Sequence, residues 1–557
     1  MMRKKRGKKL DPNLIQQILQ NTMTERIPSD TLLVEYFARP TDYDIIFNNI
    51  PAVIDGVRGT GKSMFLRFFQ IAEINKLNSN QSSTTYILPI YFKTDEHVFG
   101  FIKPKYFKNY DVFVELFRSF FVIVTMEFFL NTLHLKIQSD LVKKDLPTDL
   151  RENLINLFVK CEIAASSAND ACKSLDTLVK FFVDHRESLI KELKSKRLNE
   201  KPFDKTIPFF EDFRFLFEII NILREYLFKN PNLIVYILLD EYDKLTKDQQ
   251  SVINPLIKER YNYLTFKVAC KSGCFYNLSY PNQTIDIFDD IYWKTINRPA
   301  FRQKPSKFQD YLQDIVNKRL RKEYPKFSIQ EILGESKSLK DKIIQIKATK
   351  GRGRPILTYY GAGDVLRVSS GVARFYMNLC NEILVEGLKD PDKPDFSENV
   401  QNDAIFKYSR SRLRYAFNST LNGEDFFKLL SALSEVFRSR YRLDLRYPAT
   451  LSFAVRDYVN LSRESKNLLK NAEREGIIFQ FFRQGKDGFY NQMTYGLNGV
   501  FAPSYNLIPT YPDAVQISSK KFDLILTSQK DFLHSMKVPY DQQPLDPFLS
   551  GYSMGKP

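Results

Sequence analysis

Residues 56–63 constrain the fold of this chain more than any other segment. They read Gly-Val-Arg-Gly-Thr-Gly-Lys-Ser and fit the pattern G-x-x-x-x-G-K-[ST]. A short apolar run, 51–55, precedes them, and residues 62–76 follow with apolar side chains at helical spacing. Glycines let backbone N–H groups converge on a phosphate, and the helix start adds the positive end of a dipole. This order predicts a phosphate-binding loop, with a glycine-rich turn that binds nothing as the alternative.

The residue types of this loop assign roles to its side chains and backbone. Lys62 can neutralise β- and γ-phosphate oxygens, and the Ser63 hydroxyl can ligate Mg²⁺. We therefore expect ATP and Mg²⁺ as cofactors. The loop residues expected around the nucleotide are Gly56, Arg58, Gly59, Thr60, Gly61, Lys62, Ser63 and Met64.

An acidic pair ends the most apolar strand that the sequence predicts. Residues 233–239 read Leu-Ile-Val-Tyr-Ile-Leu-Leu, and Asp240 and Glu241 follow. A carboxylate at the end of a parallel strand lies beside such a loop, where a Mg²⁺ ligand is needed. We expect Asp240 to hold the metal through water and Glu241 to activate the attacking water as general base, which favours hydrolysis over kinase chemistry. The alternative is a pair of solvated acids.

Two later polar residues are further candidates for the site. Ser272 follows the predicted strand 263–270 and can sense the γ-phosphate and the water; the alternative is an ordinary loop start. Arg374 ends the sequence Ser-Ser-Gly-Val-Ala-Arg at the start of a predicted helix. It can reach back to the phosphates and couple the domain angle to the nucleotide state; the alternative is a surface arginine.

Strands alternating with helices predict an α/β fold with a parallel sheet and helices on both faces. Residues 86–92 give another buried strand, and from about residue 424 three helices precede a hairpin of residues 477–482 and 489–497. A helix followed by a hairpin resembles a winged helix.

The expected domains are a basic tail at 1–30, a P-loop domain at 31–295 with a helical insertion at about 95–230, a helical lid at 296–420, a winged-helix-like domain at 421–510 and a loop-rich tail at 511–557.

Composition excludes several classes of protein. The 47 Phe and 30 Tyr exclude a disordered chain, and five Cys in 557 residues exclude a disulfide scaffold. No apolar run reaches membrane-spanning length, and the basic start lacks the apolar core of a signal peptide, so we expect a cytoplasmic protein. The net charge of +17 favours a polyanionic partner, with a basic soluble surface as the alternative.

Two basic segments make weak duplex DNA binding an expectation. Arg352 and Arg354 lie in Gly-Arg-Gly-Arg-Pro, which resembles the core of an A·T minor-groove hook; the alternative is a solvated loop. Lys466 and Lys470 share one side of a predicted helix that precedes the hairpin, as in a recognition helix. Winged helices also serve as protein-interaction modules, which is the alternative here.

The motif order resembles AAA+/STAND P-loop ATPases of the origin-recognition-complex type, and more narrowly their bacterial relatives that are not replication initiators. The motifs are GVRGTGKS, LLDEYDKL, FKVACKSG and SSGVAR, followed by the winged-helix-like region. The segment 37–67, which leads into and includes the phosphate-binding loop, and the sequence GLNGVFAPSYNL also resemble that group. The resemblance covers roughly residues 35–93 and 230–510. It implies an ATP-driven switch that works as a homo-oligomer or with an effector partner, and many bacterial members are regarded as anti-phage components.

The chain departs from that family core in its long helical region and in lacking a clear arginine finger, for which Arg260, Arg298 and Arg302 are candidates. The favoured hypothesis is an ATP-hydrolysing switch in bacterial defence or related signalling, with a partner as effector. The alternatives are a DNA-binding ATPase of the replication-initiator or loader type, and a nucleotide-gated scaffold with negligible hydrolysis.

Overall fold

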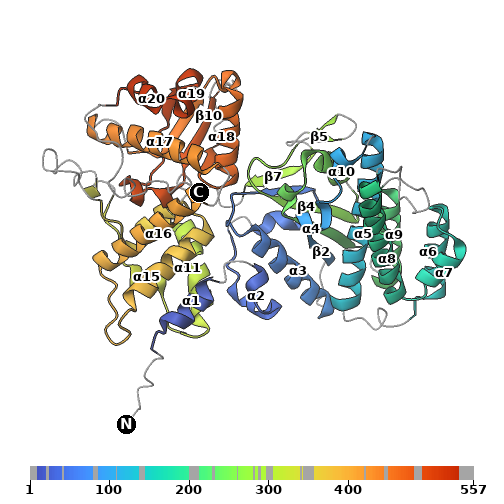
Figure 1. Cartoon of the computed structure of the whole chain (residues 1–557). Coiled ribbons are helices and arrows are strands. Elements are labelled where there is room, and N and C mark those ends of the chain that lie inside the picture. The colour runs from blue at the N-terminus through green and yellow to red at the C-terminus, as the bar shows by residue number, and fades with distance from the viewer. Residues whose placement is uncertain are drawn as a thin grey trace, which may run out of the picture.

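The computed structural model describes residues 9–20, 24–40, 43–79, 86–107, 109–136, 145–199, 213–228, 232–259, 261–276, 278–279, 283–285, 290–295, 305–338, 341–342, 357–418, 422–443, 449–481 and 492–538. These residues form two lobes (Figure 1). One lobe, here called the sheet lobe, is built on a five-stranded sheet. The other combines a group of helices with a C-terminal four-stranded sheet.

The sheet lobe has a parallel sheet, as the sequence predicted. Its strands are β1 (Ala52–Asp55), β2 (Tyr86–Lys93), β3 (Leu233–Asp240), β4 (Leu264–Cys270) and β7 (Tyr292–Thr295), in the order β2-β3-β4-β1-β7. All neighbouring pairs run parallel. The edge strand β7 was not expected, because it is short and exposes Tyr292 instead of showing an apolar run. The carboxyl ends of β1, β3 and β4 meet at one edge of the sheet, where ligands of such folds bind.

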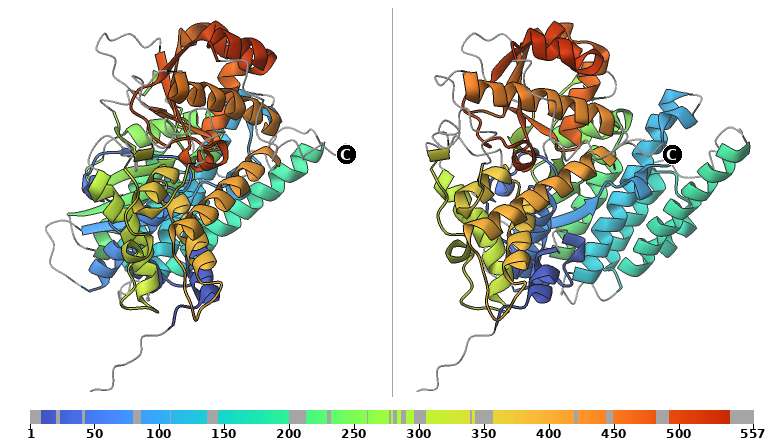
Figure 2. Two further views of the ribbon diagram at one scale, coloured as in Figure 1. Left: turned by 90° about the vertical axis from the view of Figure 1, so that its left-hand side faces the viewer. Right: turned by 60° about the vertical axis from the view of Figure 1, so that its left-hand side comes forward.

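Helices cover both faces of this sheet. On one face, Phe65 and Phe69 of α3 (Lys62–Asn78) pack against Ile54 and Tyr236. On the other face lie α10 (Lys247–Lys258) and the insertion helices, which share a core with the sheet. The insertion helices are α5 (Tyr110–Lys136), α6 (Thr148–Lys160), α7 (Ala165–Ala171), α8 (Leu175–Asn199) and α9 (Arg214–Phe228). They lie on the side of the sheet lobe away from the second lobe (Figure 1), and they run side by side (Figure 2). The expectation of a mainly helical segment here is confirmed for its described residues.

The helical group of the second lobe includes the start of the described chain. It comprises α1 (Pro12–Gln20), α11 (Pro305–Arg321), α12 (Ile329–Leu333), α14 (Gly361–Val368), α15 (Ala373–Gly387) and α16 (Glu398–Asn418). Ile15 and Leu19 of α1 are fully buried in its core, so residues 12–20 of the segment expected to be a basic tail form a packed helix. The helix α1 packs against α15 and α11 (Figure 1), whereas α2 (Asp30–Tyr36) packs against α3 of the sheet lobe and also contacts α11.

The C-terminal part differs from its sequence prediction in two ways. It contains α17 (Gly423–Leu443), β8 (Ser452–Arg456), α18 (Arg463–Arg474), β9 (Ile478–Phe481), β10 (Gln492–Leu497), β11 (Val515–Ser518), α19 (Ser519–Thr527) and α20 (Gln529–Ser535). The expected hairpin is confirmed, because β9 and β10 pair antiparallel. The prediction of three helices before it is wrong, because β8 lies between α17 and α18. The prediction of a loop-rich tail is wrong over residues 515–535, because β11 pairs with β8 and the following helices bury Phe522 and Ile525.

Within the described residues, none of the helices combines the length and apolar character that crossing a membrane requires.

Candidate functional site

The loop between β1 and α3 has the geometry that its glycines were expected to provide. Gly59 and Gly61 have φ angles of +94° and +96°, in the left-handed region that favours glycine. A Cβ atom on Gly59 would lie 2.8 Å from the Cβ of Arg374, on the second lobe. Glycine at position 59 therefore allows both the turn of the loop and the close approach of α15.

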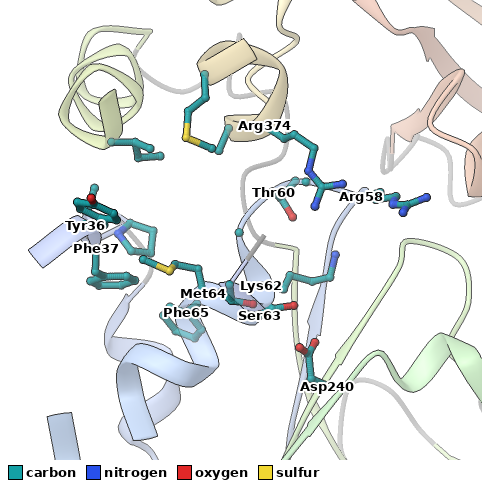
Figure 3. A pocket seen from close by; sticks show the side chains of 18 of the residues that line it. Tyr36, Phe37, Arg58, Thr60, Lys62, Ser63, Met64, Phe65, Asp240 and Arg374 are labelled. Atoms are coloured by element: carbon teal, nitrogen blue, oxygen red, sulfur yellow. The ribbon is translucent and has the colours of Figure 1, made fainter. Parts of the chain in front are cut away.

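This loop forms one wall of a cavity of about 230 Å³ between the two lobes. The expected site residues that line it are Arg58, Gly59, Thr60, Gly61, Lys62, Ser63, Met64, Asp240, Glu241 and Arg374. Gly56 and Ser272 do not line it. In Figure 3, Lys62, Ser63 and Asp240 lie at one end of the cavity, and Tyr36 and Phe37 lie at the other. The cavity thus has a charged end and an apolar end, as a nucleotide does.

The Lys62 ammonium lies inside the loop. Its Nζ donates to the carbonyl oxygens of Gly56 at 2.6 Å and Val57 at 3.2 Å. Burial lowers the pKa of Lys62, and the nearby carboxylates of Asp55 and Asp243 oppose that effect. A cation with so little water around it gains strongly from a phosphate partner.

Asp240 is held by two hydrogen bonds at the end of β3. Its Oδ2 accepts from the Tyr91 hydroxyl at 2.8 Å, and its Oδ1 accepts from the Glu241 N–H at 2.9 Å, while the Ser63 hydroxyl is near enough to stabilise the carboxylate. Burial raises the pKa of Asp240, and the Ser63 and Tyr91 hydroxyls partly offset the rise. The Ser63 hydroxyl and the Asp240 carboxylate are therefore adjacent oxygen ligands, which fits Mg²⁺.

No cluster of three or more His, Cys, Asp and Glu side chains suited to a metal occurs among the residues that the structure describes. Mg²⁺ characteristically keeps several waters and binds through one or two protein ligands plus substrate phosphates. The Ser63 and Asp240 pair meets that requirement without further protein ligands.

Glu241 follows directly, with a φ of +57°, and its carboxylate lines the cavity. Lys93, the last residue of β2, donates from Nζ to Glu241 Oε1 at 3.1 Å and also pairs with Glu25. Partial burial lowers the pKa of Lys93, but the hydrogen bonds to Glu25 and Glu241 outweigh it and hold the pKa above its ordinary value. The expected general base thus has a fixed cationic partner, which sequence reasoning missed.

Arg374 lines the cavity from the second lobe (Figure 3). Its backbone N–H donates to the Gly59 carbonyl at 3.1 Å, which joins the start of α15 to the loop. Its side chain is half-buried, and its Nε is buried without a hydrogen-bond partner among the described residues. Burial, followed by the charges of Arg58 and Arg412, lowers the pKa of Arg374. Like charges gathered at this end favour an anionic ligand.

Ser272 occupies a different place from the one expected. Its hydroxyl donates to Asp55 Oδ2 at 3.2 Å, outside the cavity lining. Its neighbour Lys271 lines the cavity instead and pairs with Asp243 at 3.4 Å. Ser272 therefore links the ends of β4 and β1 and does not line the cavity.

The apolar end of the cavity was not foreseen. Its residues come from α2, the following loop, α11 and α15, and include Tyr36, Phe37, Ala38, Pro40, Tyr311, Ile315, Arg319 and Met377. Arg319 is only 4% exposed, its guanidinium carbon lies 5.2 Å from the centre of the Tyr36 ring, and burial lowers its pKa to about 10. The adjacent aromatic residues Tyr36 and Phe37 are the local signal in the sequence that could have indicated this end.

The remaining candidates are the arginine-finger residues and the basic residues expected to contact DNA. The finger candidates Arg260, Arg298 and Arg302, and the basic pair Arg352 and Arg354, lie outside the described residues. Lys466 and Lys470 lie on α18, where each ammonium donates a hydrogen bond within the chain: Lys466 to the Val459 carbonyl at 2.7 Å, and Lys470 to the Tyr276 hydroxyl at 3.1 Å.

Comparison with known proteins adds a family. A model of the ORC-CDC6-like family matches residues 24–351 and 339–515. The matched ranges hold the loop 56–63, the acidic pair after β3, α15 and the hairpin of β9 and β10. No curated protein matches the chain.

Proposed function

The chain belongs to the ORC-CDC6-like family and is an AAA+ ATPase of that type, and we propose that it hydrolyses ATP as a switch that rearranges its two lobes. In this proposal residues 296–420 act as a lid and residues 421–510 as a winged-helix-like domain. The role that we propose is bacterial anti-phage defence or related signalling, through assembly of copies or through a partner effector. The basis for that role is the order of the motifs.

One observation carries the proposed chemistry: a single cavity gathers Lys62, the Ser63 and Asp240 pair, Glu241 and Arg374. Its apolar end suits a nucleobase, and its charged end suits a triphosphate. The helix α3 begins at Lys62 at this end, and the positive end of its dipole favours a phosphate there.

The hydrolysis that we propose uses these residues in separate roles. Lys62 and Arg374 neutralise the charge that develops on the γ-phosphate oxygens. Glu241 orients a water and accepts its proton as the water oxygen attacks the γ-phosphorus. The bond from that phosphorus to the bridging oxygen breaks, and ADP leaves with the electron pair. Mg²⁺, held by Ser63 and Asp240, would supply further charge neutralisation.

The switch proposal is supported by the residues just before Arg374. The Ser370 hydroxyl accepts from the Gly499 N–H at 2.6 Å and lies 3.1 Å from the Tyr511 hydroxyl, both in the C-terminal part. Four residues on, the Arg374 N–H bonds to Gly59 of the phosphate-binding loop. A displacement of Arg374 toward phosphates would therefore be passed to the C-terminal part.

A DNA-binding ATPase of the replication-initiator or loader type is the second candidate. It is favoured by α18, which carries Lys466 and Lys470 and is followed by the β9–β10 hairpin. In that case ATP would set a DNA-bound state, and hydrolysis would end it.

Two substitutions test the nucleotide chemistry. Lys62→Ala should abolish ATP binding in calorimetric titration, because it removes the cation at the loop. Glu241→Gln should keep ATP binding but lose at least about 10²-fold in turnover, because an amide cannot accept the proton of water. Lys244→Ala, which removes another lysine that lines the cavity, is the matched control for Lys62→Ala. Hydrolysis at the parental rate by Glu241→Gln would refute the assignment of the base.

A further inference from the structure

The hydroxyl of Tyr91 holds one oxygen of Asp240, the expected metal ligand. The two residues lie on neighbouring strands, and Tyr91 Oη is 2.8 Å from Asp240 Oδ2. In the β2–β3 pairing Tyr91 lies opposite Leu238, and Lys93 lies opposite Asp240. Because side chains two residues apart on a strand share a face, Tyr91 is on the same face of the sheet as Asp240. Its side chain therefore reaches along the sheet to the carboxylate that ends β3.

The ring of Tyr91 is fixed by packing, and it forms no part of the cavity wall. It packs against the apolar cluster that α3 forms with the sheet, which includes Phe65 and Leu238. Tyr91 is absent from the residues that line the cavity, whereas Ser63 and Asp240 belong to that lining (Figure 3). Any effect of the Tyr91 hydroxyl on a bound nucleotide therefore passes through Asp240, which makes Tyr91 a candidate positioning residue.

Both oxygens of the Asp240 carboxylate accept hydrogen bonds from the chain itself. Oδ1 accepts from the Glu241 N–H at 2.9 Å, and Oδ2 accepts from Tyr91. Asp240 is only 1% exposed, so bulk water does not readily replace either bond. A carboxylate has about four acceptor positions, so each oxygen keeps about one for a further partner. The two bonds thus fix the orientation of the carboxylate and limit how it can bind a cation.

Mg²⁺ and Ca²⁺ make different demands on such a carboxylate. Mg²⁺ keeps several of its waters and requires near-ideal octahedral geometry, so it is well served by a fixed oxygen that accepts a hydrogen bond from a metal-bound water. Ca²⁺ takes more oxygen ligands in flexible geometry and binds carboxylates directly, through one or both oxygens. A carboxylate that is already held at both oxygens meets the first demand and opposes the second.

We propose that Tyr91 determines the metal selectivity of this site, because its hydroxyl holds Asp240 in an orientation that serves hydrated Mg²⁺ and keeps Oδ2 from ligating Ca²⁺ directly. The inference rests on the proposed function, since it concerns the metal that accompanies the nucleotide. Tyr91 acts only through Asp240. Loss of its hydroxyl frees Oδ2 to turn toward a larger ion, so it weakens binding of MgATP relative to binding of CaATP.

The test measures the affinity for ATP in the presence of Mg²⁺, of Ca²⁺ or of EDTA by calorimetric titration. The full-length protein carries Glu241→Gln throughout, which should prevent turnover and retains the backbone N–H that bonds to Asp240. Addition of Tyr91→Phe, which keeps the ring, should lower the ratio of MgATP affinity to CaATP affinity by about threefold to tenfold, the size of one hydrogen bond. Affinity for ATP in EDTA should stay at the parental value, because Lys62 and the loop do not depend on Tyr91.

Tyr236→Phe on β3 is the matched control. The Tyr236 hydroxyl donates to the Phe47 carbonyl at 2.9 Å, so this change also removes a hydrogen bond of a tyrosine in the same sheet, away from Asp240. It should leave the affinity ratio unchanged. A parental or increased ratio in Tyr91→Phe, or an equal loss of affinity under all three conditions, would overturn the selectivity role. If the Glu241→Gln protein binds ATP under none of the three conditions, the proposed function fails instead, so the two failures are distinguishable.

Discussion

The ammonium of Lys93 lies 3.1 Å from Oε1 of Glu241, so the expected general base is paired with a cation that belongs to a neighbouring strand. Lys93 is in register with Asp240 across the β2–β3 pairing, which places it beside the acidic pair. Glu25 competes for the same ammonium from the segment before α2. The availability of the Glu241 carboxylate therefore depends on how Lys93 is shared.

Lys93→Met and Glu25→Gln should change ATP turnover in opposite directions. Loss of Lys93 frees the Glu241 carboxylate to accept a proton, so kcat should rise severalfold with little change in KM. The Glu25→Gln change leaves Glu241 as the one carboxylate partner of Lys93 among those the structure describes, so kcat should fall. Steady-state phosphate release measures both, and changes of equal sign would contradict the shared-cation account.

The charged end of the site could be predicted from the sequence because each of its parts is a local pattern. Gly59 and Gly61 stand where the loop needs positive φ, and Asp240 ends an apolar strand that is buried on both faces. The apolar end could not be predicted, because Phe37, Ile315 and Met377 come from segments that only tertiary packing joins. Lys93 was missed for a similar reason, since its role follows from strand register.

The same distinction holds for the fold. The parallel sheet and the hairpin follow from apolar runs and turn signals, which are local. The strand β11 has only four residues in a region rich in Pro and Tyr, and its structure depends on the free edge of β8. The segment that contains α1 was expected to be a basic tail, because its place beside α15 requires a core that forms from distant segments.

Arg374→Ala should separate nucleotide binding from domain movement. The side chain is half-buried beside the like charges of Arg58 and Arg412, so its removal relieves charge repulsion and should leave the fold intact. ATP should still bind, because Lys62 and the loop remain. The ATP-dependent change in small-angle scattering should disappear. A change as large as that of the parent would remove Arg374 from the switch.

Glu473 makes the contact of α18 with the loop at 271–276 dependent on pH, because its carboxylate packs against Gly273, where a Cβ atom would lie 3.2 Å from Glu473 Oε2. The groups that share its surroundings are Asp55, Cys274 and Tyr495. In the folded state the pKa of Glu473 is about 7, above the ordinary value of 4.5, so folding and docking favour the protonated acid. The stabilisation is complete below about pH 4.5 and is lost as the pH rises toward 7.

The parent should therefore show a larger radius of gyration at pH 8 than at pH 6, and Glu473→Gln should keep the compact value at both. An amide retains the shape of the side chain and carries no charge to desolvate beside Asp55. Glu475→Gln, a change at an exposed acid just after the same helix, is the control and should behave as the parent does. The same pH response in Glu473→Gln and in the parent would assign the effect to another group.

Duplex DNA binding should be weak in the parent and stronger when the Lys470 ammonium is released from Tyr276. The structure engages the Lys470 ammonium with Tyr276, while the net charge of +17 still attracts a polyanion. Tyr276→Ala removes no cation, so any gain in affinity comes from release of a charge already present. Each additional phosphate contact steepens the slope of log K against log salt by about 0.9, so binding should fade sharply between roughly 50 and 200 mM salt, more steeply in Tyr276→Ala than in the parent.

Replacing Arg352 and Arg354 with Ala should lower affinity for duplex DNA and flatten the slope in both backgrounds. Fluorescence anisotropy with a labelled duplex, with and without ATP, measures these slopes. If neither protein binds duplex at low salt, α18 is not a DNA-contacting helix, and its basic side chains are left for a protein partner.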